Sequence, residues 1–261
     1  MSKSVLSVIT ARAGSKGVIG KNYKLLNGVP LVGWSIFHSI CCPDIDLTVV
    51  SSNCPHVRRI VSAIQSEIRG GDRMGILDTK YASIFNVTAM DFGRLEFIQR
   101  PDRMATDTSR NEEALVHAYE HAKKSFEINA DIIVNLQPTS PIRSEYLIHR
   151  CLEKFLLSKA DSLFTATRHT PFFFKDKDGV AIAKWDYKNR PMRQELEEDE
   201  FLFHDNGNIY VMSRNLLLKS RCRMGGKMVM FETDRYEGIQ VDTTEDFAYI
   251  KYLISSGLID S

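Results

Sequence analysis

The chain has 261 residues, of which 43% are hydrophobic and 26% charged, so it is long enough to bury the core of one globular domain. Its 34 basic and 33 acidic residues nearly cancel, which argues against a broad nucleic-acid-binding surface. No apolar run reaches the roughly 18 residues of a membrane-spanning helix, and no export signal precedes the first strand. We therefore expect a cytoplasmic protein that binds neither nucleic acid nor membrane.

Predicted strands and helices alternate along most of the chain. Apolar, β-branched runs predict buried strands, and amphipathic runs that follow proline or small polar residues predict helices. Strands are expected at 5–11, 47–50, 95–99, 131–136, 162–167 and 208–212, and helices near 30–40, 55–64, 112–122 and 145–157, with a closing helix that begins at Thr243 or Thr244. Asn206-Gly207 is expected to form a turn, Thr108 or Ser109 to cap the helix near 112–122, and Asp246 to cap the closing helix. This alternation predicts an α/β fold in one domain over 1–261, with a Rossmann-like, mostly parallel sheet and helices on both faces.

The first predicted strand runs into a small, basic loop. Residues 11–22 read ARAGSKGVIGKN, and their glycines allow the backbone to turn tightly. Exposed N–H groups beside Arg12, Lys16 and Lys21 suit a polyphosphate. The loop lacks the GxxxxGK[ST] and GxGxxG orders. An ordinary strand-to-loop turn with solvated basic residues stays an alternative.

A second polar segment, NLQPTSPIR at 135–143, follows the strand at 131–136. Open α/β sheets bind ligands where their strands end, and the Gln137 amide offers both a donor and an acceptor. Pro138 and Pro141 stiffen the turn, and Arg143 adds charge. The same residues also fit a strand exit with no ligand.

The pattern changes at 168–205, which is strand-like, aromatic and charged by turns. Three consecutive phenylalanines at 172–174 are unfavourable on an exposed loop, so they fit a protruding element buried against a second subunit. Arg190 and Arg193 could hold a carboxylate through their guanidinium groups. A solvated basic turn, balanced by the acidic run at 195–200, is the alternative.

Taken together, these motifs resemble those of the acylneuraminate cytidylyltransferases, the family that makes CMP-sialic acid and related CMP-sugars. The resemblance covers residues 5–250 in the family's order, and the motifs at 11–22 and 136–143 are nearly literal matches. Further matches are RPDRMATDT at 100–108, RPMRQ at 190–194, HDNGNIYVM at 204–212 and YEGIQVDTTEDFAYI at 236–250.

The resemblance implies that CTP lies on the basic loop. The implied catalytic residues are Arg12, Lys21 and Asp242. Asp242 is expected to bind Mg²⁺ or Mn²⁺, and Gln240 stands where the family has a second aspartate, as a neutral oxygen ligand. The implied nucleotide contacts are Ala11, Arg12, Ala13, Gly14, Ser15, Lys16, Lys21, Asn22, Arg100 and Asp107.

On the sugar-acid side, the resemblance implies contacts from Gln137, Arg190, Arg193, Gln194 and Asn206. It also implies that 168–205 is a dimerisation arm that reaches the partner's active site, so a homodimer is expected. Met192 stands where the family often has arginine, and His204 replaces a basic residue found in some members. The segment 69–93 is longer than usual and reads as a surface insertion, with a lid or an oligomer contact as alternatives.

The expected enzyme is a nucleotidyltransferase that activates a nonulosonic, sialic-type acid with CTP and releases pyrophosphate. An enzyme like the CMP-Kdo synthetases, which use an eight-carbon acid, is one alternative, and a catalytically weakened nucleotide-binding homologue is another because Gln240 carries no charge. A glycosyltransferase would need a DxD motif after an apolar strand, and neither 44–46 nor 176–178 meets that condition. His117 and His121 are spaced for a metal on one helix face, but no third ligand is evident.

Overall fold

The computed structural model describes residues 3–14, 16–70 and 93–258. In this part of the chain, seven strands form one sheet in the order β11-β7-β10-β6-β1-β4-β5. Every neighbouring pair is parallel except those of β10, which runs against both β6 and β7. The strands are β1 (Val5–Thr10), β4 (Leu47–Ser52), β5 (Arg94–Gln99), β6 (Ile132–Leu136), β7 (Ser162–His169), β10 (Leu202–Ser213) and β11 (Met228–Thr233).

Helices cover both faces of this sheet. Because side chains alternate across a strand, Val5 and Ile9 of β1 enter one hydrophobic cluster and Leu6 and Val8 enter another. The first cluster includes residues of α1, α2, α5 and α7, and the second includes residues of α4 and α6. The helices are α1 (Leu31–Ile40), α2 (Pro55–Gly70), α4 (Asn111–Ser125), α5 (Leu147–Leu157), α6 (Arg214–Ser220) and α7 (Thr244–Ser255). The predicted Rossmann-like architecture is therefore confirmed.

Short strands and 3-10 helices lie in the segments between these main strands and helices. They are η1 (Lys21–Tyr23), β2 (Leu25–Leu26), β3 (Val29–Pro30), η2 (Asp102–Met104), β8 (Phe174–Lys177), β9 (Val180–Ala183), η3 (Arg193–Glu195) and η4 (Glu198–Glu200). Among the described residues, no helix has the length and apolar character needed to cross a membrane.

The carboxyl ends of β1, β4, β5 and β6 lie at one edge of the sheet, and hydrogen bonds tie the ends of β1, β4 and β5 together there. The Ala11 N–H donates to the Ser51 carbonyl at 3.0 Å, and the Arg100 N–H donates to the Ser52 carbonyl at 2.9 Å. The buried Ser52 hydroxyl donates back to the Ala11 carbonyl at 2.5 Å. The chain segments that leave these strands therefore start from a rigid base, at the edge where open α/β sheets bind ligands.

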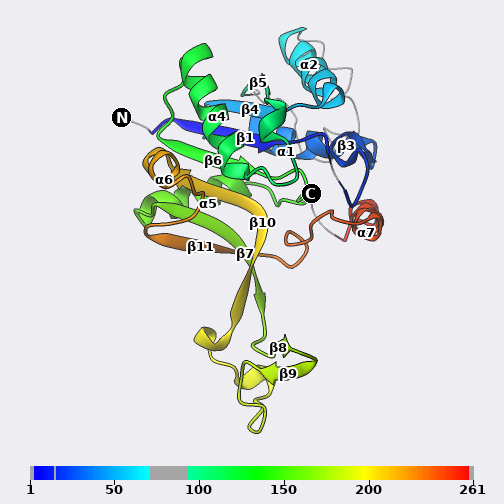
Figure 1. Ribbon diagram of the computed structural model, residues 1–261, viewed down its shortest axis with the longest axis vertical. Coiled ribbons are helices and arrows are strands. Elements are labelled where there is room, and N and C mark those ends of the chain that lie inside the picture. Colours follow the sequence, from blue (N-terminus) through cyan, green and yellow to red (C-terminus); the bar gives the residue numbers. More distant parts are fainter. Residues whose placement is uncertain (1–2, 15, 71–92, 259–261) are drawn as a thin grey trace.

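A long arm projects from the sheet on β7 and β10 (Figure 1). These two strands stay paired as far as His169 and Leu202, and residues 170–201 continue beyond them with the β8–β9 hairpin. Several large apolar side chains on the arm are exposed, namely Phe173, Phe174, Val180, Ile182, Tyr187 and Met192. The protrusion expected at 168–205 is present, although its two ends belong to strands of the sheet, and its role in dimerisation stays a prediction.

Two local predictions were wrong. Asn206 and Gly207 do not form a turn, because they lie in a bulge of β10 between Asp205, which pairs with Ala166, and Tyr210. Gly207 adopts a φ of 68° there, which favours glycine.

The helix α4 begins at Asn111 without a side-chain cap, so neither Thr108 nor Ser109 caps it. By contrast, Thr243 and Asp246 cap α7 reciprocally, as the sequence predicts. Most of the insertion expected at 69–93, residues 71–92, lies outside the described residues.

Candidate active site

A cavity of about 390 Å³ opens at the carboxyl edge of the sheet. Arg12 reaches it from the loop after β1, Arg100 from the end of β5 and Gln137 from the end of β6, while Asp242 approaches from the segment before α7. The lining residues are Thr10, Arg12, Lys16, Gly17, Lys21, Asn22, Arg100, Met104, Ser109, Arg110, Asn111, Gln137, Pro138, Thr139 and Asp242. The fold thus gathers five of the ten predicted nucleotide contacts around one cavity, namely Arg12, Lys16, Lys21, Asn22 and Arg100.

The charge of this lining is strongly positive. Its cations outnumber its one carboxylate, Asp242, by five to one; they are Arg12, Lys16, Lys21, Arg100 and Arg110. The first residue of α4, Asn111, also lies at the cavity, and a helix N-terminus carries partial positive charge. A polyphosphate suits such a surface.

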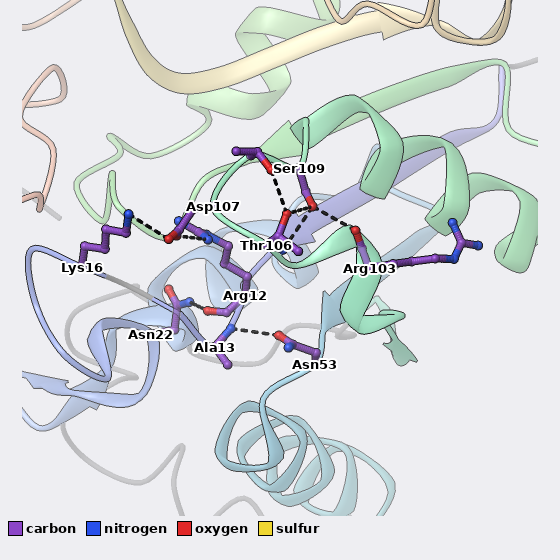
Figure 2. A network of polar contacts seen from close by, with 10 residues as sticks. Arg12, Ala13, Lys16, Asn22, Asn53, Arg103, Thr106, Asp107 and Ser109 are labelled. Carbon is purple, nitrogen blue, oxygen red and sulfur yellow. Dashed lines mark hydrogen bonds and ion pairs between the residues drawn. The ribbon is translucent and has the colours of Figure 1, made fainter.

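Two cations of the basic loop converge on one carboxylate (Figure 2). Arg12 Nη1 lies 2.7 Å from Asp107 Oδ1, and Lys16 Nζ lies 2.8 Å from Asp107 Oδ2. The hydrogen bonds from Lys16 and Arg12 lower the pKa of Asp107. Asp107, predicted as a nucleotide contact, therefore sits beside the lining residues and holds two of them.

More backbone groups of the loop form hydrogen bonds within the chain than the sequence predicts. The Ala13 N–H donates to Asn53 Oδ1 at 2.9 Å, and both backbone polar groups of Ala11 bond to the end of β4. Ala11, Ala13 and Gly14 are not among the lining residues. Contacts through exposed N–H groups of Ala11 and Ala13, which the sequence suggests, are thus at odds with this geometry, and Ser15 lies outside the described residues.

Asn22 and Lys21 close the other end of the loop. Asn22 Nδ2 donates to the Arg12 carbonyl at 2.9 Å. Lys21 Nζ donates to the Val241 carbonyl at 2.5 Å and lies 3.2 Å from Asp242 Oδ1. Any side chain at position 17 would overlap the Asp242 carbonyl, so Gly17 permits this docking. The two predicted catalytic residues Lys21 and Asp242 are therefore in contact.

Arg100 is buried, with 4% of its surface exposed. Its Nη2 donates to the Ser51 carbonyl at 2.7 Å and its Nε to the Ser51 hydroxyl at 3.2 Å. Burial, and secondarily the charge of Arg12, lower the pKa of Arg100 to about 10. The group remains a cation at neutral pH, fixed at the back of the cavity.

Gln137 lines the cavity on the side of β6. Its carbonyl accepts hydrogen bonds from the Ser35 hydroxyl at 3.2 Å and from Arg143 Nη2 at 3.1 Å. Arg143 is fully buried, and burial lowers its pKa to about 9. Arg143 therefore supports the turn from below and does not bring charge to a ligand, as its place in the motif suggested.

Asn206, predicted as a sugar-acid contact, is fully buried. Its Oδ1 accepts from the Thr165 hydroxyl at 2.7 Å, and its Nδ2 donates to the hydroxyls of Thr167 and Thr233 at 3.1 and 2.8 Å. These bonds engage both polar atoms of the amide, so the structure contradicts a side-chain contact from Asn206 to a substrate. The residue fixes the bulge of β10.

Gln240, the other residue of the metal motif, donates from Nε2 to the Asn206 carbonyl at 2.5 Å and is not a lining residue. Within the described part of the chain, no group of three or more His, Cys, Asp and Glu side chains could hold a metal ion. His117 and His121 therefore have no third metal ligand among the described residues. Of the two predicted metal ligands, Asp242 alone reaches the cavity.

The arm residues predicted to bind the sugar acid stay apart from this cavity. Arg190, Arg193 and Gln194 are exposed, and none is a lining residue. The guanidinium of Arg190 lies over the rings of Phe172 and Trp185, 4.2 and 5.5 Å from their centroids. One chain therefore brings together the nucleotide half of the predicted site and not its arm half.

Sequence reasoning missed several residues of the cavity, chiefly Arg110, Met104 and Thr139. Arg110 directly precedes α4, so a basic residue just before the predicted helix was a usable signal. Asn111 also lines the cavity, and its Nδ2 donates to Asn135 Oδ1 at 2.9 Å.

Comparison with known proteins supports the resemblance. The cytidylyltransferase family matches residues 6–69. Post-translational flagellin modification protein B of Campylobacter coli is 26% identical over 254 residues, which cover 96% of this chain and 94% of that protein. CMP-N,N'-diacetyllegionaminic acid synthase of Campylobacter jejuni is 25% identical, with 96% and 95% covered.

The N-acylneuraminate cytidylyltransferase of Oncorhynchus mykiss is 23% identical over 94% of this chain, which spans about half of that longer protein, 49%. Among solved structures, a CMP:2-keto-3-deoxy-manno-octonic acid synthetase complexed with CTP superposes with a TM-score of 0.62 at 15% identity, with 97% of this chain and 99% of that chain covered. The 4-diphosphocytidyl-2C-methyl-D-erythritol synthase of Anaerococcus prevotii gives 0.59 at 13% identity, with 98% and 100% covered. These structures share the fold.

Proposed function

We propose that this chain, which the cytidylyltransferase family matches over residues 6–69, transfers the CMP unit of CTP to a nonulosonic sugar acid and releases pyrophosphate. The observation that carries the proposal is the cavity at the carboxyl edge of the sheet, where five cations face one carboxylate. The near full-length likeness to a CMP-N,N'-diacetyllegionaminic acid synthase supports the class of acceptor.

In this reaction, the anomeric hydroxyl oxygen of the acid attacks the α-phosphorus of CTP. An O–P bond forms, the bond from the α-phosphorus to the bridging oxygen breaks with pyrophosphate as the leaving group, and the hydroxyl proton passes to solvent water. Such a step asks little covalent chemistry of the protein, so positioning and charge stabilisation supply the rate. Arg12, Lys16 and Lys21 would neutralise the triphosphate, with Arg100 fixed behind them.

Asp242 would hold a Mg²⁺ or Mn²⁺ ion. Mg²⁺ binds through one or two carboxylates together with waters and substrate phosphates, and Asp242 is exposed at the cavity beside Lys21. This donor set fits an ion that arrives with the nucleotide. When bound, the ion would supply Lewis-acid stabilisation of phosphate charge. Gln240 would not bind the ion directly. It would support the site through its hydrogen bond to the Asn206 carbonyl.

A homodimer would complete the sugar-acid half of the site. Arg190, Arg193 and Gln194 project on the arm and do not line the cavity of their own chain. The exposed apolar side chains of the arm favour burial against a second copy. We expect the arm of one subunit to bring these residues to the carboxylate of the acid in its partner, where guanidinium groups can bind it bidentately.

The test is pyrophosphate release from CTP with a panel of acids: sialic, legionaminic, pseudaminic and deaminated nine-carbon acids, and the eight-carbon Kdo. Release with CTP and a nine-carbon acid, and not with ATP or GTP, is the expected result. Release with Kdo alone would favour an enzyme like the neighbour of known structure, which is named for that class of acid. No release with any acid would refute the proposed function.

A further inference from the structure

Arg168 lies where the arm leaves the sheet. It is in β7 and pairs with Phe203 of β10, one position before the last paired residues. Its side chain is only 33% exposed, although the surrounding ribbon is two strands wide. The guanidinium lies over the rings of Phe201 and Phe203, with centroids 4.7 and 5.6 Å away. Two aromatic residues thus hold this cation at the base of the arm.

The same guanidinium bonds two carboxylates on different parts of the molecule. Nε and Nη2 donate to the two oxygens of Glu232 in β11, at 2.7 and 2.9 Å. Nη1 and Nη2 donate to the two oxygens of Glu198 in η4, at 3.2 and 2.9 Å. Glu232 belongs to the edge strand of the sheet, and Glu198 belongs to the arm. Arg168 therefore links arm and sheet through two bidentate pairs.

The arm needs such a link because a two-stranded ribbon is only marginally stable by itself. The bonds of β7 with β10 fix the start of the ribbon, but they do not set its angle to β11. Arg168 can set that angle because the five donors of arginine lie in one rigid plane. The contact also distinguishes one member of the acidic run at 195–200: among the described residues, Glu198 pairs with Arg168 and Asp199 forms no ion pair.

We propose that Arg168 is a positioning residue that fixes the arm against β11 and so determines where Arg190, Arg193 and Gln194 reach the sugar acid. This inference rests on the proposed function for the acid-binding role of the arm. It assigns Arg168 no contact with substrate. The orientation of the arm, and not the strength of nucleotide binding, is what the residue controls.

The experiment compares Glu198→Gln with Asp199→Asn in the full-length protein. Both variants remove one negative charge from the same turn, but only the first breaks a bidentate pair with Arg168. Limited trypsin digestion reports arm mobility at Lys175, Lys177, Lys184, Lys188 and Arg193. We expect arm cleavage about tenfold faster in Glu198→Gln and unchanged in Asp199→Asn, because a charge-assisted bidentate pair is lost only in the first.

Arg168→Lys keeps the positive charge but loses both bidentate pairs with the glutamates. Steady-state kinetics of this variant give a second measurement. We expect the KM for the acid to rise about tenfold while the KM for CTP stays within about twofold. Arg223→Lys is the matched control, because Arg223 also pairs with a glutamate, Glu112, and lies over an aromatic ring, Tyr210, but it does not link the arm.

Equal digestion of the Glu198→Gln and Asp199→Asn proteins would overturn the proposal. An equal rise of both KM values in Arg168→Lys would overturn it as well, because general structural damage would explain that result. If the parent protein released no pyrophosphate with any acid, the proposed function would fail and the acid-binding role of the arm with it. The digestion would still decide separately whether Arg168 fixes the arm.

Discussion

The cavity and the arm differ in how their cationic side chains are held. Around the cavity, four of the five cations are anchored by the chain itself: Arg100 bonds to β4, Lys21 to the Val241 carbonyl, and Arg12 and Lys16 to Asp107. On the arm, Arg193 is exposed, and Arg190 lies over the aromatic rings of Phe172 and Trp185. One region is preorganised for a ligand within a single chain, and the other is held out into solvent.

This difference suggests how the two substrates divide the molecule. A polyphosphate needs several cations at fixed positions, and the rigid carboxyl edge of a parallel sheet provides them. Residues on a protruding arm can differ among related proteins without disturbing that edge, because loops and extensions tolerate change more than the core does. Under the proposed function, the cavity would bind the constant substrate, CTP, and the arm would bind the variable one, the acid. The four predictions that follow test this division.

The largest effect is expected for Lys21→Ala. Lys21 bonds the Val241 carbonyl and pairs with Asp242, so its loss removes a cation from the triphosphate and loosens the segment before α7. Removing one preorganised electrostatic contact costs about 10²–10³ in rate, and we expect at least this loss in kcat/KM for CTP. Lys24→Ala is the control, because Lys24 is exposed three residues away, over Phe247. Normal CTP kinetics in Lys21→Ala would remove the basic loop from the site.

A smaller loss, about 10²-fold, is expected for Asp242→Asn, since one electrostatic contact to the phosphates through a metal is lost. The fold should be unaffected, because Asp242 contributes its backbone N–H to the Asp246 carboxylate and an asparagine keeps that bond. Metal binding, followed by titration calorimetry with and without CTP, should require the nucleotide. Glu245→Gln removes a neighbouring exposed carboxylate as the control. Full activity in excess EDTA would show that no metal acts at Asp242.

The preorganised region was also the more predictable one. The sequence predicts where β1 and β6 end, and the residues that follow these strands, Arg12 and Gln137, both reach the cavity. Parallel strands bring their carboxyl ends to one edge whatever their separation in the chain, so a local pattern was enough. The role of Gly17 could also be predicted from a local pattern, because a turn rich in glycine permits a close approach of the backbone.

The wrong assignments share another cause. Asn206 and Arg143 belong to motifs that match the family, yet both are buried and bond to partners far along the chain, such as Thr233 and Ser35. A motif shows that a side chain is needed, but only the tertiary pairing shows whether it faces a ligand or supports a turn. The direction of the arm depends on Arg168 bonding Glu232, a contact between residues that no local pattern connects.

The arm residues should act on the other substrate. Arg193→Ala should raise the KM for the acid about tenfold or more, the effect of losing one charge-assisted contact, with little change in the KM for CTP. If the arm acts across subunits, mixing equal amounts of the Arg193→Ala and Lys21→Ala proteins, at an acid concentration well below KM, should restore about a quarter of the parental activity, because half of the dimers are mixed and each mixed dimer has one intact site. An active monomer in light scattering would contradict this arrangement.

The smallest effect is expected for Asp107→Asn, which removes the ion pairs to Arg12 and Lys16 at the rim of the cavity. Exposed ion pairs contribute little, so the KM for CTP should change only about two- to threefold. Those two cations lower the pKa of Asp107, so the carboxylate stays ionised until the pH falls through that lowered value, below 3.8. Its interactions are present above its unfolded pKa and are lost only in acid.

It follows that Asp107 cannot produce an acid limb in the pH profile of kcat/KM between about pH 5 and 8, the range in which histidine titrates. The profiles of the parent and of Asp107→Asn should therefore run parallel over this range. Thr108→Val, a change at the adjacent exposed residue that keeps the carboxylate, serves as the control. An acid limb in the parent that disappears in Asp107→Asn would mean that Asp107 titrates at a raised pKa when CTP is bound. In that case the triphosphate would displace its carboxylate from Arg12 and Lys16, and the loop would be less preorganised than the unliganded structure indicates.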